Sequence, residues 1–206
     1  MKEERILFTD PNFKQIYAKY YKDSLFVVVA LHELLGHGTG KLFTKNIDGK
    51  SNFDENLINP LTNQKITTYY EEGEDWHSKF GDLSGTYEEC RADAVALYLS
   101  TFDEILDILL PAHSKEEKAQ ILICCWYDVI YSAVRGLKEY SPESMKWGQA
   151  HMGGNYAILK VDIYITYFYC SIIFTILPFF ILAKNKKIKL NNISFNFRLL
   201  LMQILI

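Results

Sequence analysis

The stretch SLFVVVALHELLGHGTGKLF, residues 24–43, leads from an apolar helical run directly into His32, Glu33 and His37. Two imidazoles and a carboxylate on an apolar helix are costly to bury unless a cation binds them. Neutral imidazole nitrogens are good zinc ligands, and a neighbouring carboxylate can accept a proton from a metal-activated water. The stretch therefore predicts a helix that carries a metal centre.

His32 and His37 are five residues apart, whereas the histidines of a zinc-protease helix are usually four apart. In a regular α-helix the longer spacing turns the two rings about 140° from each other. A single π-type turn restores a common face, and Gly36 is where the backbone can absorb it. We therefore predict a local widening of the helix at 32–37. The alternative is a pair of ordinary helix histidines near a glutamate.

A second cluster, Tyr87-Glu-Glu-Cys-Arg-Ala-Asp93, supplies carboxylates for such a centre. Glu89 and Asp93 are four apart and share a helical face, so one can bind the metal while the other orients a histidine. Glu88 points elsewhere around the helix and can orient the other histidine. The alternative is that Thr86 and Glu89 form a capping box at a helix start.

Three further histidines lie outside the two clusters: His77, His113 and His151. His151 follows Trp147 in a Gly-rich segment, and a lone histidine there is more often structural than functional. Spacing alone does not distinguish His151 from His77 or His113.

Composition excludes some classes of function. The 206 residues carry 22 Lys plus Arg against 25 Asp plus Glu, a net charge of -3, so there is no electrostatic case for a nucleic-acid partner. Hydrophobic residues make up 49% of the chain, enough for one core. The four cysteines form no C-x-x-C pair, which favours reduced, buried thiols. Residues 1–8 lack the pattern of a secretory signal, so we expect a cytoplasmic protein.

The pattern predicts a mainly α fold with a long irregular loop over 44–86. Apolar spacing predicts a helix over 86–110, ended by Pro111. The segment SKEE at 114–117 predicts a capped helix running to about residue 140, and Ser-Pro at 141–142 predicts the start of another. We see no internal repeat and no strand pair with a hairpin turn.

The composition changes near residue 160, which divides the chain into a helical core, 1–160, and a divergent apolar tail, 161–206. Residues 163–183 carry no charge and are followed by lysines, a pattern typical of a membrane-spanning helix. Pro178 and the many β-branched residues argue against this interpretation. A buried helix of a larger protein and a gene-model artefact are the alternatives. Contact with a membrane is expected only through 163–183.

At its two motifs the chain resembles the dipeptidyl peptidase III family of zinc exopeptidases. That family is marked by H-E-L-L-G-H, found here at 32–37, and by E-E-C-R-A-E/D, found here at 88–93. The similarity covers most of residues 10–160. It implies a fragment of the helical, zinc-binding upper lobe of a two-lobe metallopeptidase.

The resemblance also implies a role for each matching residue at the metal. One zinc ion per chain would be bound by His32, His37 and Glu89. Glu88 and Asp93 would orient the two histidines through hydrogen bonds.

Two further residues take catalytic roles by the same resemblance. Glu33 would be the general base toward the attacking water. His151 matches the family's histidine in Q-A-H-M, which hydrogen-bonds the substrate and stabilises the developing oxyanion. The implied activity is removal of dipeptides from the N-terminus of short peptides.

The chain departs from the family pattern at several points. The family's mostly β lower lobe would lie before Met1. After Met152 the family usually carries Gln-Ala-Arg, where this chain has Gly153-Gly154-Asn155.

On the strength of its two motifs, we predict that the chain is a zinc-dependent dipeptidyl peptidase. The alternative is a zinc-binding, catalytically inactive fragment, tethered to a membrane by residues 163–183. The pattern does not predict an oligomeric state.

Overall fold

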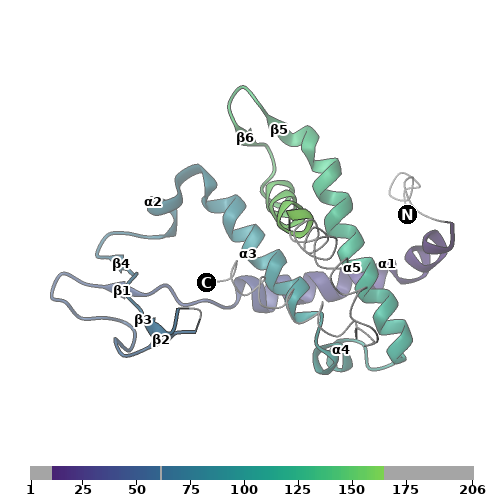
Figure 1. Ribbon diagram of the computed structural model, residues 1–206, viewed down its shortest axis with the longest axis horizontal. Helices are drawn as coiled ribbons and strands as arrows, with labels where there is room; N and C mark the ends of the chain where they lie inside the picture. Colours follow the sequence, from purple (N-terminus) through teal and green to yellow (C-terminus); the bar gives the residue numbers. More distant parts are fainter. Residues whose placement is uncertain (1–10, 61, 165–206) are drawn as a thin grey trace, which may run out of the picture.

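The computed structural model describes residues 11–60 and 62–164, and the fold over these residues is mainly helical, as the sequence predicts (Figure 1). The helices are α1 (Pro11–Leu31), the π-helix η2 (His32–His37), α2 (Trp76–Phe80), the 3-10 helix η3 (Gly81–Leu83), α3 (Ser84–Leu99), α4 (Asp103–Leu109), α5 (Lys115–Gly136), the 3-10 helix η4 (Leu137–Glu139) and a further helix over 150–164.

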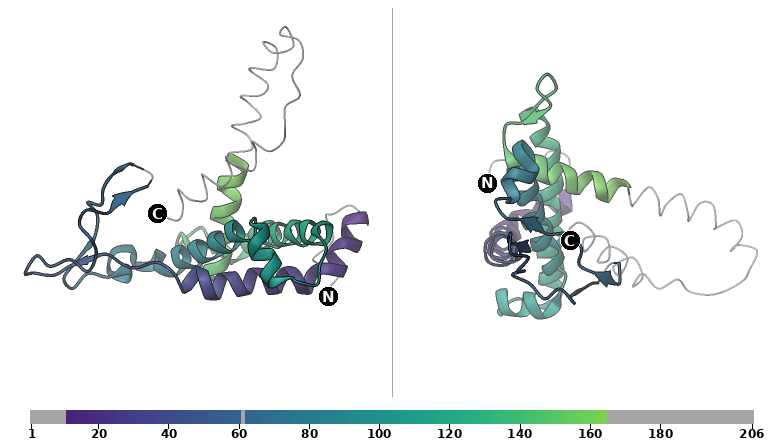
Figure 2. Two further views of the ribbon diagram at one scale, coloured as in Figure 1. Left: turned by 90° about the horizontal axis from the view of Figure 1, so that it is seen from below. Right: turned by 90° about the vertical axis from the view of Figure 1, so that its left-hand side faces the viewer.

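The long helix α1 is the base on which the other helices pack. It lies against α5 and α3, and η2, which follows it directly in the chain, packs against α3. The helix over 150–164 crosses these elements and projects from them in the turned views (Figure 2). Its first turns pack tightly, because a Cβ on Gly154 would lie 2.9 Å from the backbone nitrogen of Cys90 in α3. This crossing brings three distant parts of the sequence together.

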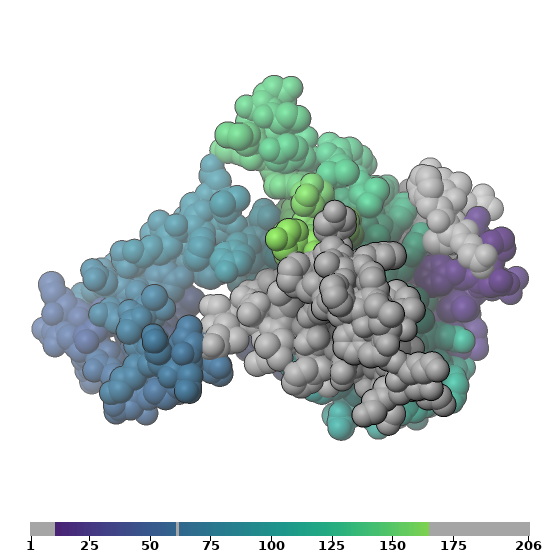
Figure 3. All heavy atoms as spheres, in the orientation of Figure 1, coloured from purple at the N-terminus to yellow at the C-terminus, as the bar shows by residue number. Residues whose placement is uncertain are grey.

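Residues 38–75 form the predicted long connection, which extends to one side of the helices (Figure 3). The structure adds short strands that the sequence did not predict. β1 (Thr44–Lys45) pairs in parallel with β4 (Tyr70–Glu71), and β2 (Ile58–Asn59) pairs antiparallel with β3 (Gln64–Lys65). The loop ends earlier than residue 86, because α2 begins at Trp76 behind an Asp75 capping box.

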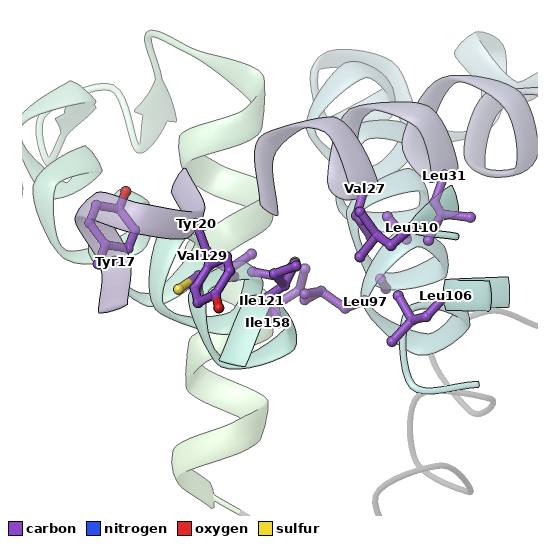
Figure 4. Packing of buried hydrophobic residues seen from close by; sticks show 14 of the residues in the cluster. Tyr17, Tyr20, Val27, Leu31, Leu97, Leu106, Leu110, Ile121, Val129 and Ile158 are labelled. Carbon is purple, nitrogen blue, oxygen red and sulfur yellow. The ribbon is translucent and has the colours of Figure 1, made fainter. Parts of the chain in front are cut away.

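The hydrophobic core lies where α1, α3, α5 and the helix over 150–164 meet (Figure 4). Its buried side chains come from every one of these helices and from α4: Tyr17, Tyr20, Val27, Leu31, Leu97, Leu106, Leu110, Ile121, Val129 and Ile158. Burying a large aliphatic side chain contributes about 1.5–3 kcal/mol. The core therefore holds α1 and α3, the two helices that carry the predicted motifs, in a defined relative position.

The start of α5 is confirmed as a capping box. The backbone nitrogen of Glu117 donates to Ser114 Oγ at 3.2 Å, and Ser114 N donates to Glu117 Oε2 at 3.1 Å. Glu117 also accepts hydrogen bonds from Lys19 and Tyr20 of α1. The cap thus satisfies backbone N–H groups that would otherwise lack partners at the start of α5. It also joins the beginning of α5 to α1.

The single helix predicted over 86–110 is wrong, because the chain breaks between α3 and α4. Ser100 Oγ donates to the carbonyl of Leu97, and Thr101 Oγ1 donates to the carbonyl of Tyr98. These hydroxyls satisfy carbonyls of the last turn and favour the end of α3 at Leu99. The alternative of a capping box at Thr86 and Glu89 is not realised, since α3 begins at Ser84 without a side-chain cap.

The helix predicted to start at Ser141-Pro142 is wrong as well. β5 (Tyr140–Ser141) and β6 (Lys146–Trp147) form an antiparallel hairpin there. Its turn includes Met145 with a positive φ of 55°. The next helix begins only at residue 150.

Three cysteines follow the prediction of reduced, buried thiols. Cys90, Cys124 and Cys125 are unpaired and buried, while Cys170 lies outside the described residues. Burial raises the pKa of the Cys90 thiol to about 11, so this residue, although next to Glu89, stays a neutral thiol.

Within 11–60 and 62–164, no helix combines the length and apolar character that crossing a bilayer requires. The possible span at 163–183 lies outside these residues apart from Ile163 and Tyr164.

Candidate metal centre

The widened turn predicted at 32–37 is confirmed: η2 is a π-helix over these six residues. Its i to i+5 hydrogen bonding puts residues five apart on one face. The rings of His32 and His37 therefore lie side by side, with centroids 4.6 Å apart and ring planes at 88°. Both imidazoles are turned toward α3.

Gly36 allows this turn to approach α3 closely. A Cβ at Gly36 would lie 2.8 Å from both the Cα and the Cβ of Ala92, closer than side chains pack. Both residues are buried. The absence of a side chain at position 36 therefore sets the distance between the two histidines and the carboxylates of α3.

Helix α3 brings Glu89 to both histidines. Glu89 Oε2 lies 3.2 Å from His32 Nε2 and 3.4 Å from His37 Nε2. This oxygen is buried and has no hydrogen-bond partner within the described part of the chain. Such an atom is costly unless another group satisfies it.

These distances fit a tetrahedral metal ion. Ligand atoms about 2.0–2.1 Å from zinc at tetrahedral corners lie about 3.3–3.4 Å from one another. His32 Nε2 and His37 Nε2 stand at this separation from Glu89 Oε2. Two imidazole nitrogens and one carboxylate oxygen are also a typical donor set for zinc. The residues present therefore fit the metal that the sequence predicts.

Each histidine is oriented by its own carboxylate. His32 Nδ1 lies 2.8 Å from Asp93 Oδ1, and His37 Nδ1 lies 3.0 Å from Glu88 Oε1. A proton on Nδ1 of each ring leaves Nε2 unprotonated, with its lone pair directed toward Glu89. The geometry thus brings Glu88 and Asp93 to the places where orienting groups are expected.

Asp93 is the more enclosed of the two orienting carboxylates. Burial opposes its ionisation, but the nearby His151 imidazole and the hydrogen bond with His32 hold its pKa below the ordinary value. The same hydrogen bond raises the pKa of His32, although burial partly offsets this effect. Asp93 is therefore a carboxylate, available to accept from an imidazole N–H.

His151 reaches the same place from the helix over 150–164. Its Nδ1 lies 3.3 Å from Glu89 Oε2 and 3.7 Å from Asp93 Oδ2. Donor atoms of His32, Glu89 and His151 all lie within 4.8 Å of one another, so these three could also hold an ion. We prefer His37 as the second nitrogen ligand because its other ring nitrogen is hydrogen-bonded to Glu88, whereas His151 faces carboxylates with Nδ1 itself.

The other two histidines that the sequence left open lie elsewhere. His77 Nδ1 is 2.9 Å from Ser84 Oγ, and His113 Nε2 is 3.7 Å from Asp23 Oδ2.

Glu33, which the sequence predicts to be the general base, is exposed next to His32. The interaction of its ring N–H with the Asp93 carboxylate raises the pKa of His151, and the negative charges of Glu89 and Glu33 raise it further. The Glu33 carboxylate is therefore close enough to His151 for its negative charge to raise the pKa of that imidazole.

Sequence reasoning missed Arg91. Its guanidinium donates to both oxygens of Glu88, from Nε at 2.9 Å and from Nη2 at 2.5 Å. The three-residue spacing of Glu88 and Arg91 on one helix could have indicated this pair.

Known proteins are similar to this chain over the part that carries the site. The model of peptidase family M49 matches residues 1–168, past residue 160, where the resemblance was expected to end. A dipeptidyl peptidase 3 of Nematostella vectensis is 42% identical over 160 residues, which are 77% of this chain and 22% of that protein. Dipeptidyl peptidase 3 of Homo sapiens is 38% identical over 159 residues, 77% of this chain and 21% of the human protein. This chain thus spans about a fifth of the length of these relatives. The predicted family resemblance is confirmed, and the chain belongs to peptidase family M49.

Proposed function

We propose that this chain carries the zinc-binding catalytic centre of a dipeptidyl peptidase, which removes dipeptides from the N-terminus of short peptides. The observation that carries the proposal is the buried Glu89 Oε2, which lies 3.2 and 3.4 Å from the Nε2 atoms of His32 and His37. One zinc ion per chain would be held by these three side chains. When bound, zinc supplies a Lewis acid that polarises a carbonyl and acidifies water.

Glu33 is the proposed general base. It follows His32 in η2 and is exposed, so a water and a peptide can reach its carboxylate. It takes a proton from the attacking water and passes it to the leaving amine. Positioned proton transfer of this kind contributes about 10²–10⁴-fold to a rate.

His151 is the proposed donor to the scissile carbonyl oxygen. Its Nδ1 faces Glu89 and Asp93, which leaves Nε2 as the ring's other nitrogen for a substrate. The carboxylates favour the imidazolium, which donates from both nitrogens. A donor aimed at the developing negative charge stabilises the transition state by about 2.7–4 kcal/mol.

The test is release of dipeptides from a short unblocked peptide by the zinc-loaded 206-residue chain, followed by mass spectrometry. Glu33→Gln should lower the rate by at least about 10²-fold, because the amide cannot accept the proton. Glu104→Gln, an exposed change on α4, is the matched control and should leave the rate unchanged. A Glu33→Gln chain as active as the parent contradicts the proposal.

A second candidate function is zinc binding without turnover. It is favoured by one observation, that His151 Nδ1 lies as close to Glu89 Oε2 as the two η2 histidines do. Four protein ligands would close the coordination sphere, as in structural zinc sites. The same assay separates the two candidates, since this chain would then take up zinc and release no dipeptide.

A further inference from the structure

Arg91 contacts the metal centre through Glu88. It lies on α3, three residues after Glu88, and its side chain is 19% exposed. Its Nε and Nη2 donate to Oε2 and Oε1 of Glu88, a two-point contact that fixes the plane of the carboxylate. Glu88 Oε1 also accepts from His37 Nδ1. The chain of contacts therefore runs from Arg91 through Glu88 to His37.

The two histidines differ in how their orienting carboxylates are held. Asp93, the partner of His32, has a short side chain that is 9% exposed, so packing confines it. Glu88, the partner of His37, has one more rotatable bond and is 31% exposed. An exposed glutamate samples several rotamers unless another group holds it. The fork of Arg91 supplies the restraint that burial supplies to Asp93.

The loop after η2 passes near the guanidinium. Gly40 has a positive φ of 95°, and a Cβ there would lie 3.4 Å from Arg91 Nη1. The backbone of the loop thus passes close to the Arg91 guanidinium, at a separation where a Cβ on Gly40 would just be in ordinary contact with it.

We propose that Arg91 is a positioning residue of the metal centre: by fixing Glu88 it holds the His37 ring with Nε2 directed at the metal. The inference rests on the metal centre of the proposed function. It predicts that loss of the fork weakens metal binding through His37 and leaves the His32 side of the site intact.

The experiment compares Arg91→Met and Arg91→Lys with the parent in the full 206-residue chain. Zinc affinity is measured by competition with a chromophoric chelator, and the ligand field by the visible spectrum after Co²⁺ loading. Arg91→Met should bind zinc about tenfold more weakly, at the lower end of the effect of removing a partner of a metal ligand. Arg91→Lys keeps the charge without the fork and should recover part of this loss. Arg135→Met on α5 is the matched control.

Two readouts distinguish positioning from general support. The Co²⁺ spectrum of Arg91→Met should change, while thermal unfolding of the metal-free chain should stay that of the parent. In a Glu88→Gln background, Arg91→Met should weaken zinc binding by less than about twofold further, because the two residues act in series.

Several results would overturn the inference. An Arg91→Met chain with the zinc affinity and Co²⁺ spectrum of the parent refutes the positioning role. So does a full tenfold loss in the Glu88→Gln background, or a loss of affinity that only follows unfolding of the metal-free chain. A parent chain that takes up no metal refutes both this inference and the proposed function. A parent that binds zinc while Arg91→Met binds equally well refutes only the inference.

Discussion

Gly36→Ala tests whether the contact between η2 and α3 sets the geometry of the site. The added Cβ would lie 2.8 Å from Cα and Cβ of Ala92 and 3.0 Å from its carbonyl oxygen. Ordinary contact begins at 3.4 Å, so the two elements must separate by about 0.6 Å, the difference between 3.4 and 2.8 Å. The obstacle includes backbone, so no rotamer change can relieve it.

The magnitude follows from two opposed effects. Overpacking of this kind costs about 1–3 kcal/mol, and the better helix propensity of alanine returns up to about 1 kcal/mol. We expect a net loss of about 1–2 kcal/mol in the free energy of unfolding. A shift of 0.6 Å also exceeds the tolerance of about 0.2 Å for ligand distances at a metal. Zinc affinity should therefore fall by at least about tenfold, or 1.4 kcal/mol.

The assay is urea unfolding followed by circular dichroism, together with zinc titration against a chelator. Gly85→Ala in α3 is the matched control, because no atom lies within 4 Å of a Cβ added there. This control should stabilise the chain by about 0.5–1 kcal/mol and leave zinc affinity unchanged. A Gly36→Ala chain that matches the parent in both stability and zinc affinity would refute the reasoning.

Two further predictions concern stability. Leu97→Ala should lower the free energy of unfolding by about 2–5 kcal/mol in urea titrations, since Leu97 is fully buried in the core, whereas the exposed Ile108→Ala should change it by less than about 0.5 kcal/mol. Backbone and side-chain hydrogen bonds from Ser114, Lys19 and Tyr20 lower the pKa of Glu117 from 4.5 to about 2. Because this pKa is depressed by folding, the stability that Glu117 contributes is present above about pH 4.5 and is lost as the pH falls toward 2. Glu117→Gln should flatten the pH dependence of the thermal midpoint in this window, and an unchanged acid limb would contradict the assignment.

Local features of this chain were predictable because their causes are local. The five-residue spacing of His32 and His37 allows a shared face only in a π-type turn, and η2 is that turn. The start of α5 was predictable for the same reason, since Ser114 and Glu117 satisfy each other's backbone donors within one turn.

Other features were missed because they depend on which of several competing local hydrogen bonds the chain forms. Ser141-Pro142 is a good helix start, yet a hairpin of β5 and β6 forms there. Pairing between the two short strands competes with local helix capping, and the sequence pattern does not show which of the two is favoured. The break between α3 and α4 depends on where the Ser100 hydroxyl finds an acceptor, which apolar periodicity does not report.

The sequence by itself determined the helical class and the two motifs, because residue type and short spacing carry that information. Spacing alone left His151 equal to His77 and His113, and only the family resemblance favoured His151. The tertiary structure brings it to the site, because the glycines after His151 let their helix cross α3 and place its ring beside Glu89. The proposed role of Arg91 also rests on the structure, since Glu88 accepts from both Arg91 and His37 only because packing brings η2 against α3. Convergence of this kind is set by core packing over the whole chain, and no local spacing records it.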